Sequence, residues 1–394
     1  MSTLRVVVAG MVSLPPFAAG TAWDRVAYVV GMRQLGHDVV FVEEVRSDWC
    51  RDAAGRRCSY AASANRAIFE RTMRRFDLLS SACQIFDDGS ETTGLRLVDL
   101  LEAVSRADLL VNISGHLTTP LVLDRVARRA YLDQDPVYTQ LWDAEWAADL
   151  GLDDHDVLFT TGTNIGTPRS DIPTGDRVWH HTVPPVVLGD WRVPGPSRPR
   201  RNTTVASLGR YADLPCGGRW YRSKEPELER FARLPRAAGG DFEIALAGGE
   251  RHAATVERLR DGGWSVIDAG RLADLDSYRA YIAGSAAEIG IAKGAYVEGH
   301  AGWIGDRSCQ YLAAGRPVLL QSTGLCATVP LGEGLLEFGS LDEAVEAAAA
   351  IESDYDRHAR RARELAREHF DAATVVGALV ENAMSQQAAP GGPR

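Results

Sequence analysis

The chain contains 394 residues, of which 45% are hydrophobic and 24% are charged. This composition is ordinary for folded domains and excludes a largely disordered or fibrous chain, while the length predicts two or three domains. The formal net charge is −10, from 53 acidic and 43 basic residues. We therefore expect no nucleic acid among the partners, because a nucleic-acid backbone attracts basic proteins. No apolar run approaches the roughly 18 residues of a membrane-spanning helix, and membrane association is not expected.

Cysteine usage and the first residues bear on the compartment. Six cysteines are scattered without a C-x-x-C pair, which favours reduced thiols over zinc ligands or a disulfide framework. The opening segment MSTLRVVVAG predicts a first strand, because its apolar run is too short for a secretory signal. We expect a cytoplasmic protein. Only two of the 43 basic residues are lysines, Lys224 and Lys293, a bias typical of a GC-rich bacterial genome.

In the first half, short apolar runs alternate with amphipathic stretches. Residues 4–9 predict a buried strand, and apolar residues spaced about 3.6 apart predict a helix over 22–35. Gly36 ends that helix, and strands are expected at 38–43, 108–113 and 156–160. This β-α-β order predicts a parallel sheet with helices on both faces.

A second unit of the same kind follows a proline-rich segment. Residues 193–201 read VPGPSRPRR, the composition of a linker, and the alternation of strands and helices then restarts. We predict an α/β protein of two Rossmann-like lobes that face each other across a cleft, with helices closing the chain. The predicted divisions are a first lobe at 1–195, a second at 196–370, and at 371–394 a helix packing back on the first lobe and a disordered tail.

Common catalytic signatures are missing. The G-x-G-x-x-G fingerprint does not follow the first strand, which argues against a classical NAD enzyme, and no G-x-x-x-x-G-K-[ST] phosphate loop occurs. H-E-x-x-H and G-x-S-x-G are absent as well. What remains is a set of loops in the second half. Gly209-Arg210 ends a strand, residues 246–250 form a glycine turn, and residues 306–308 open a helix whose free amides suit a diphosphate.

These segments carry a family resemblance. Residues 35–39 (LGHDV), Gly209-Arg210, the turn at 247–250 and Gly315-x-Pro317-Val318 resemble the GT-B glycosyltransferases, in order and spacing, over nearly the whole chain. The second lobe is similar to the donor lobe of the retaining, family 4-like members. The resemblance implies that the second lobe binds a nucleotide-diphosphate sugar, the first lobe binds the acceptor, and no metal or other cofactor is needed.

Carried over residue by residue, the resemblance implies a donor site. Arg210 would hold the diphosphate with Lys224 as its partner, and Glu298 would contact the transferred sugar, because Glu298-Gly299 resembles the start of the family's E-x7-E pattern. Gln310 takes the place of the second glutamate, which puts the ribose contact in doubt because an amide accepts fewer hydroxyl bonds than a carboxylate. The expected donor-binding residues are Arg210, Lys224, Gly248, Lys293, Gly299, Asp306, Arg307, Ser308 and Gln310.

The catalytic and acceptor residues are expected mainly in the first lobe. The catalytic candidates are Glu298, His116, which matches a cleft histidine of similar enzymes, and Asp133. The acceptor-binding candidates are Asp135, Thr163, Asn164 and Trp142. Ordinary structural roles stand beside these: a surface ion pair for Arg210, a turn before Pro136 for the two aspartates, a tight turn for 159–166, and a core position for the tryptophan.

The sequence thus predicts a glycosyltransferase that moves a sugar from a nucleotide-diphosphate sugar to a small soluble acceptor, such as a nucleoside or polyketide of bacterial secondary metabolism. Glu298 favours a reaction that retains the configuration at the anomeric carbon. Two alternatives stay open: a sugar-nucleotide 2-epimerase of the same fold, and a two-lobed protein that binds its ligand without turnover.

Overall fold

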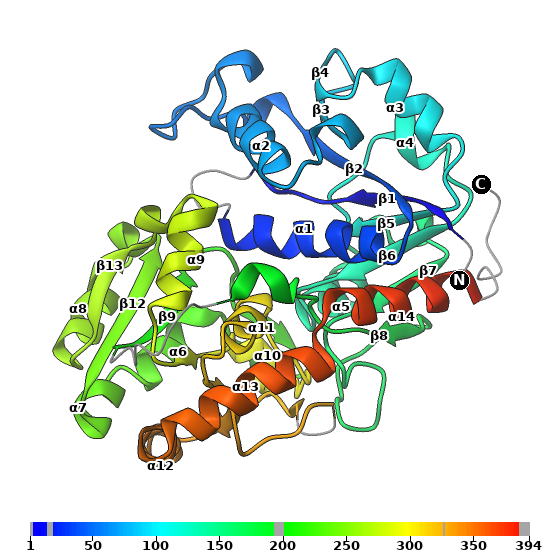
Figure 1. Ribbon diagram of the computed structural model, residues 1–394. Coiled ribbons are helices and arrows are strands. Elements are labelled where there is room, and N and C mark those ends of the chain that lie inside the picture. The colour runs from blue at the N-terminus through cyan, green and yellow to red at the C-terminus, as the bar shows by residue number, and fades with distance from the viewer. Residues whose placement is uncertain (1–2, 14–18, 193–200, 326–327, 386–394) are drawn as a thin grey trace.

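The computed structural model describes residues 3–13, 19–192, 201–325 and 328–385, which form two α/β lobes (Figure 1). All of the predicted linker except Arg201, and the predicted tail beyond Ser385, lie outside these ranges. Among the described residues, no helix is both long and apolar enough to span a bilayer. The described cysteines are free thiols, whereas Cys326 lies outside the described residues.

The first lobe is built on an eight-stranded sheet in the order β4-β3-β2-β1-β5-β6-β7-β8. Only β3 and β4 pair antiparallel within it. The central strand β1 is buried on both faces, as expected of a parallel strand covered by helices. The strands are β1 (Arg5–Ala9), β2 (Asp38–Val45), β3 (Ala82–Phe86), β4 (Glu91–Gly94), β5 (Leu109–Ile113), β6 (Arg129–Asp133), β7 (Val157–Thr160) and β8 (Trp179–His181).

The second lobe contains a six-stranded parallel sheet in the order β13-β12-β9-β14-β15-β16. Its strands are β9 (Arg201–Ser207), β12 (Asp241–Ala247), β13 (Ser265–Asp268), β14 (Glu288–Gly290), β15 (Val318–Gln321) and β16 (Leu335–Phe338). A separate hairpin, β10 (Leu214–Cys216) and β11 (Arg219–Tyr221), stands between β9 and the next helix. Its turn is Gly217-Gly218, both with positive φ, the backbone that two-residue hairpin turns require.

Helices flank both sheets. Those of the first lobe are α1 (Ala19–Gln34), α2 (Ala64–Arg75), α3 (Leu97–Val104), α4 (Pro120–Leu123) and α5 (Tyr138–Trp146). Those of the second are α6 (Lys224–Arg230), α7 (Leu234–Ala238), α8 (Ala253–Asp261), α9 (Leu275–Ala283), α10 (Gly294–Glu298), α11 (Asp306–Ala313), α12 (Leu341–Ser353) and α13 (Tyr355–His369).

The final helix, α14 (Ala372–Ser385), returns to the first lobe and packs on α1 (Figure 1). Its apolar face joins the core under β1, and Gly31 of α1 permits the approach, because a Cβ there would lie 2.8 Å from the Ala372 carbonyl oxygen. The chain therefore crosses between the lobes near residue 186 and again near 371. Backbone hydrogen bonds join the two crossing segments. Val186 N–H donates to the Phe370 carbonyl (2.7 Å), and Ala372 N–H donates to the Val186 carbonyl (3.0 Å).

The fold class predicted from the sequence is confirmed, and the predicted elements fall on observed strands and helices with ends shifted by a few residues. The predicted helix over 22–35 is α1, and the predicted strand over 108–113 is β5. The hairpin β10–β11, the edge strands β4 and β8 and the strand β3 next to β4 were not predicted, because short strands with mixed polar residues lack a clear apolar period.

Candidate active site between the lobes

A cavity of about 590 Å³ lies between the lobes. Its walls are formed by the loops at the carboxyl ends of β1, β5, β6 and β7 on one side and of β9, β12, β13 and β14 on the other. Parallel sheets place ligands at this edge, and two facing sheets therefore enclose one shared site. We call the half lined by the second lobe the donor half and the half lined by the first lobe the acceptor half.

Four cationic side chains line the donor half and its border: Arg210, Lys224, Lys293 and Arg307. The Lys224 ammonium donates a hydrogen bond to the Ile291 carbonyl. Burial holds the pKa of Lys224 well below its usual range, and the charges of Arg307 and Lys293 lower it further. An anion that enters between these groups offsets both the cost of burying the cations and their mutual repulsion.

Arg307 is fixed in the first turn of α11 by two acceptors, one of them on a fully buried residue. Its Nε donates to Glu288 Oε1 (2.5 Å) and its Nη1 to the Val205 carbonyl (2.5 Å). Glu288 is fully buried on β14, so the ion pair anchors the helix start to the centre of the sheet. The neighbouring Asp306 also lines the cavity; burial, with the charge of Asp24, raises its pKa to about 7. It therefore opposes a nearby phosphate less than a full carboxylate would.

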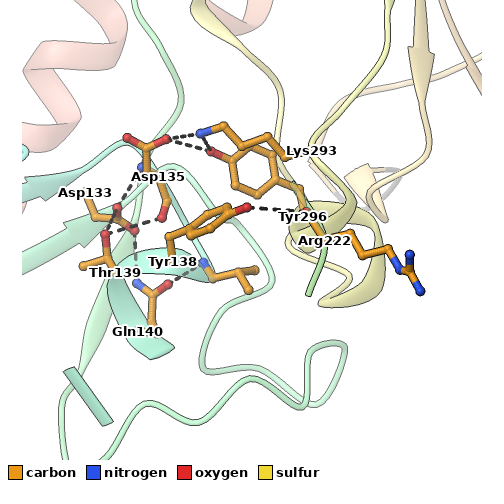
Figure 2. Close-up of polar contacts among 9 residues, drawn as sticks. Asp133, Asp135, Tyr138, Thr139, Gln140, Arg222, Lys293 and Tyr296 are labelled. Carbon is orange, nitrogen blue, oxygen red and sulfur yellow. Dashed lines mark hydrogen bonds and ion pairs between the residues drawn. The ribbon is translucent and has the colours of Figure 1, made fainter. Parts of the chain in front are cut away.

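Asp133, at the end of β6, is held by hydrogen bonds in the acceptor half (Figure 2). It accepts from the hydroxyls of Thr139 and Thr160 (2.7 Å each). It also accepts from Gln140 Nε2 (3.0 Å) and from the backbone N–H of Asp135 (2.8 Å). Burial raises the pKa of Asp133. With two donors on each oxygen, this carboxylate shapes the turn at 133–140, and the predicted catalytic role becomes a positioning role.

Asp135 reaches across to the second lobe (Figure 2). Its Oδ1 lies 2.5 Å from Lys293 Nζ and accepts a hydrogen bond from the Tyr296 hydroxyl at 2.8 Å. Burial alone would raise the pKa of Asp135, but Lys293 and the hydrogen bonds from Tyr211 and Tyr296 outweigh it and lower the pKa to about 2. Lys293 Nζ also lies 3.6 Å from the centre of the Tyr211 ring, a cation–π contact.

His116 lines the acceptor half on the loop after β5. Burial, aided by the charge of Arg25, lowers the pKa of His116 to about 4, so the imidazole is neutral at pH 7. Its ring makes no hydrogen bond with the part of the chain that the structure describes. A neutral imidazole with a free ring nitrogen can accept a hydrogen bond or a proton from a ligand hydroxyl.

Glu298 is not where the sequence placed it. It is the last residue of α10, exposed and outside the cavity, whereas Tyr296 of the same helix lines the cavity. Two residues along a helix are about 200° apart around its axis, so both cannot face the same side. The expected contact between Glu298 and the transferred sugar is therefore corrected.

Thr163 and Asn164 also lie outside the cavity, and both join the lobes. The Thr163 hydroxyl donates to the Gly302 carbonyl at 2.8 Å. The Asn164 amide donates to the carbonyls of His300 (3.0 Å) and Gly324 (2.9 Å). These bonds use the Thr163 hydroxyl and the Asn164 amide nitrogen, so the loop is a structural contact between lobes.

Four further donor candidates stand behind the cavity wall. Gly299 packs on the first lobe, where a Cβ would come within 2.8 Å of Val137 Cγ2. Gly248 has φ of +79°, and a Cβ would approach the Leu208 carbonyl oxygen to 2.9 Å. Ser308 is buried. Gln310 accepts a hydrogen bond from the Tyr278 hydroxyl (3.0 Å), and it is Tyr278 that lines the cavity.

Trp142 lines the acceptor half as expected. Its ring stacks on that of Tyr211, with centroids 5.9 Å apart and planes 13° from parallel. Tyr211 follows Arg210 and leads into the hairpin β10–β11, which packs against the first lobe through Leu214 and Tyr221. The second lobe thus supplies part of the aromatic wall of the acceptor half, which sequence analysis missed although Gly217-Gly218 is a hairpin signal.

Sequence analysis also missed the pair that His252 forms with Glu225 in the donor half. His252 lines the cavity after the glycine turn at 247–250, and its Nδ1 lies 2.9 Å from Glu225 Oε1. Its Nε2 faces Gly209, where a Cβ would lie only 3.1 Å away. The glycine turn at 247–250 was a signal that could have drawn attention to His252, because residues just after such a turn often contact a ligand.

No known family model matches the chain, and no curated protein matches it either. The class of the fold comes from solved structures, and it is the GT-B fold of glycosyltransferases. An α-glucosyltransferase in complex with UDP and a 13-mer DNA with a central A:G mismatch has a TM-score of 0.59 at 12% identity, covering 98% of this chain and 100% of that chain. Anabaena Alr3699/HepE in complex with UDP and glucose has a TM-score of 0.58 at 11% identity, with 97% and 100% covered. A glycosyltransferase from Rickettsia africae ESF-5 has a TM-score of 0.52 at 8% identity, with 98% and 100% covered.

One prediction about partners is wrong. The exclusion of nucleic acid rested on the net charge of −10, yet the α-glucosyltransferase with this fold was solved in complex with DNA, also with DNA containing an HMU base or an abasic site. A total charge sums over the whole surface, whereas contacts to phosphates depend on local clusters of basic side chains. Net charge alone therefore does not exclude nucleic acid for this fold.

Proposed function

We propose that the protein is a glycosyltransferase that moves a sugar from a nucleoside-diphosphate sugar to an acceptor hydroxyl. The observation that carries the proposal is the interlobe cavity, with the cations of Arg210, Lys224 and Arg307 in one half and the neutral His116 in the other. The solved structures with this fold that contain UDP or UDP-glucose support UDP as the nucleotide.

In this proposal the donor half binds the diphosphate. When the bond between the anomeric carbon and the phosphate oxygen breaks, negative charge grows on the departing nucleoside diphosphate. Lys224 and Arg307 are already held in place by Ile291 and Glu288, so they stabilise that charge without reorganising. We propose that these cations make a metal ion or other cofactor unnecessary, and that activity persists in the presence of a chelator.

His116 would accept a hydrogen bond from the acceptor hydroxyl and direct its oxygen towards the anomeric carbon. The new bond joins these two atoms as the bond to the phosphate oxygen breaks, the hydroxyl proton passes to His116, and the nucleoside diphosphate leaves as an anion. We propose retention of configuration, although Glu298 no longer supports it. The support is that an enzyme named as an α-glucosyltransferase shares the fold and was solved with UDP-glucose, whose glucose is α-linked.

For the acceptor, we propose a hydroxyl compound with a flat ring system, because Trp142 and Tyr211 form an aromatic wall in the acceptor half. A small bacterial secondary metabolite such as a nucleoside or polyketide fits this description. A base within a nucleic acid presents the same planar chemistry, so DNA belongs in the same screen.

The test combines binding and turnover. A thermal-shift screen with UDP, GDP, ADP and dTDP should single out one nucleotide, since a ligand at 100 times its Kd stabilises the folded state by about 2.7 kcal/mol. The matching nucleotide sugar is then incubated with and without acceptors, and the anomer is read by proton NMR. Rapid conversion of the sugar itself without acceptor would indicate the epimerase, and tight binding without any turnover would indicate a binding protein.

A further inference from the structure

The ion pair of Asp135 and Lys293 joins the two lobes inside the cavity (Figure 2). Asp135 follows β6 of the first sheet and Lys293 follows β14 of the second. Both side chains line the cavity, and both are mostly shielded from solvent, with 29% and 18% of the side-chain surface exposed. The pair thus lies where the donor half meets the acceptor half.

Lys293 belongs electrostatically to both halves. Its ammonium contacts Asp135 and the Tyr296 hydroxyl (2.7 Å) on one side. On the other side, the positive charges of Arg210 and Lys224 act on it within the same cavity. In the arrangement seen here, the carboxylate of Asp135 is the anion next to a group of cations that suits a diphosphate.

The two partners of the pair are not equally free to move. Asp135 is fixed at its backbone, because its N–H donates to Asp133, whose oxygens are also held by Thr139, Thr160 and Gln140. Lys293 has a four-carbon stem with rotatable donors, so its ammonium can turn towards another anion while the stem stays beside the Tyr211 and Tyr296 rings. If the pair separates, the lysine moves.

We propose that Asp135 and the diphosphate of the donor compete for Lys293, so that donor binding transfers the ammonium from the carboxylate to the phosphate and leaves Asp135 free to accept a hydrogen bond from another group of the acceptor. The inference rests on the proposed function and deepens it by assigning a switch between the two halves. A buried ammonium is costly to leave unpaired, but the exchange replaces one anion by another. The Asp135 carboxylate, released into the acceptor half, becomes a hydrogen-bond acceptor for the second substrate.

The exchange implies an order of binding. Without donor, Asp135 is occupied by Lys293 and Tyr296, so this group of the acceptor meets a carboxylate that is already engaged. With donor, the carboxylate is exposed to the acceptor. The acceptor should therefore bind tightly only after the nucleotide sugar.

The first experiment uses the wild-type protein. Because the chain has two lysines, ¹³Cε-lysine labelling gives one signal for Lys224 and one for Lys293, assigned by loss of one signal in Lys293→Met. Addition of UDP should shift the Lys293 signal, whereas uridine, which lacks phosphate, should leave it in place. A UDP titration that moves the Lys224 signal alone would overturn the exchange.

The second experiment measures affinity by calorimetry. Asp135→Asn keeps the shape and removes the competing charge, so the Kd for UDP should fall about tenfold, equivalent to about 1.4 kcal/mol, while the Kd for uridine is unchanged. Lys293→Met should raise the Kd for UDP by a similar factor, and Asp135→Asn should then have no further effect. The matched control is Asp171→Asn, which breaks another ion pair between the lobes, to Arg219 (2.5 Å), at an exposed site outside the cavity.

The outcomes separate the two proposals. If UDP binds the wild type but Asp135→Asn leaves its Kd unchanged or raises it, the competition is wrong and the proposed function stands. If the wild type binds none of the nucleoside diphosphates, the proposed function fails first. Should Asp135→Asn fold poorly, the lysine spectrum of the wild type still decides the matter.

Discussion

The two halves of the cavity are built in different ways. In the donor half, Lys224 and Arg307 are held by contacts within the second lobe, to Ile291 and Glu288. In the acceptor half, Asp135 is neutralised by a lysine from the opposite lobe, and Trp142 stacks on a tyrosine from it. The donor half is thus complete in one lobe, whereas the acceptor half takes its shape only when the lobes meet. Substitutions in the two halves should therefore change stability and activity in different ways.

The largest effect is expected from Arg307→Leu, which tests whether the donor half is a rigid unit. The substitution leaves the fully buried Glu288 without its cation. Breaking one side of a buried ion pair costs about 3–5 kcal/mol of unfolding free energy, measured by urea denaturation. The double variant Arg307→Leu with Glu288→Leu should recover part of that loss, and no recovery would mean that the cost comes from packing instead.

Arg210→Ala should separate chemistry from stability in the same half. Arg210 is exposed at the cavity wall, so the unfolding midpoint should stay the same. Turnover of the nucleotide sugar should drop by about 10²–10³, the usual range for removing one group that stabilises transition-state charge. Arg251→Ala, an exposed arginine nearby and outside the cavity, is the control. Equal rates for both variants would remove Arg210 from the site.

In the acceptor half, His116 should make the stability of the protein depend on pH. The pKa of His116 is lowered to about 4 in the folded protein from an ordinary value of 6.5, so the unfolded chain binds a proton that the folded one does not. The contribution of neutral His116 to the free energy of unfolding is fully present above pH 6.5 and is lost as the pH falls towards 4. The stability of wild type relative to His116→Gln should therefore decline over this interval. A constant difference across the range would show that the ring is not buried in its neutral form.

The smallest effect is expected from Glu298→Gln. The residue is exposed and outside the cavity, so both the rate of transfer and the anomer of the product should be unchanged within about twofold, and surface changes of this kind alter stability by less than about 0.5 kcal/mol. A large loss of transfer would require the α10 segment to turn when substrate binds.

The sequence was most informative where function follows from a position at the end of a strand. Arg210, Lys224, Lys293 and Arg307 follow buried strands or begin helices, and they do line one cavity. The sequence predicted the wrong role where the orientation of a side chain depends on partners far away in the chain. Thr163 and Asn164 are small polar residues in a cleft loop, but their hydrogen-bond donors are taken by carbonyls more than a hundred residues away.

Glu298 shows a second limit. The resemblance placed it by counting along the chain, yet the short helix α10 sets its direction, and that helix brings Tyr296 inwards instead. The opposite error concerns Tyr211 and His252, which line the cavity but belong to no familiar motif. Their positions depend on the hairpin β10–β11 and on the pair with Glu225, neither of which can be derived from local periodicity.

The bonded pair of chain crossings near residues 186 and 371 also constrains motion. Two crossings joined by backbone hydrogen bonds act as paired hinges, because they bend together and restrict the twisting of one lobe against the other. Opening of the cavity should therefore be a rotation that preserves which loops face each other. A chain cut before α14 would lose one of these hinges, and with it both the direction of opening and the cover over the apolar side of α1.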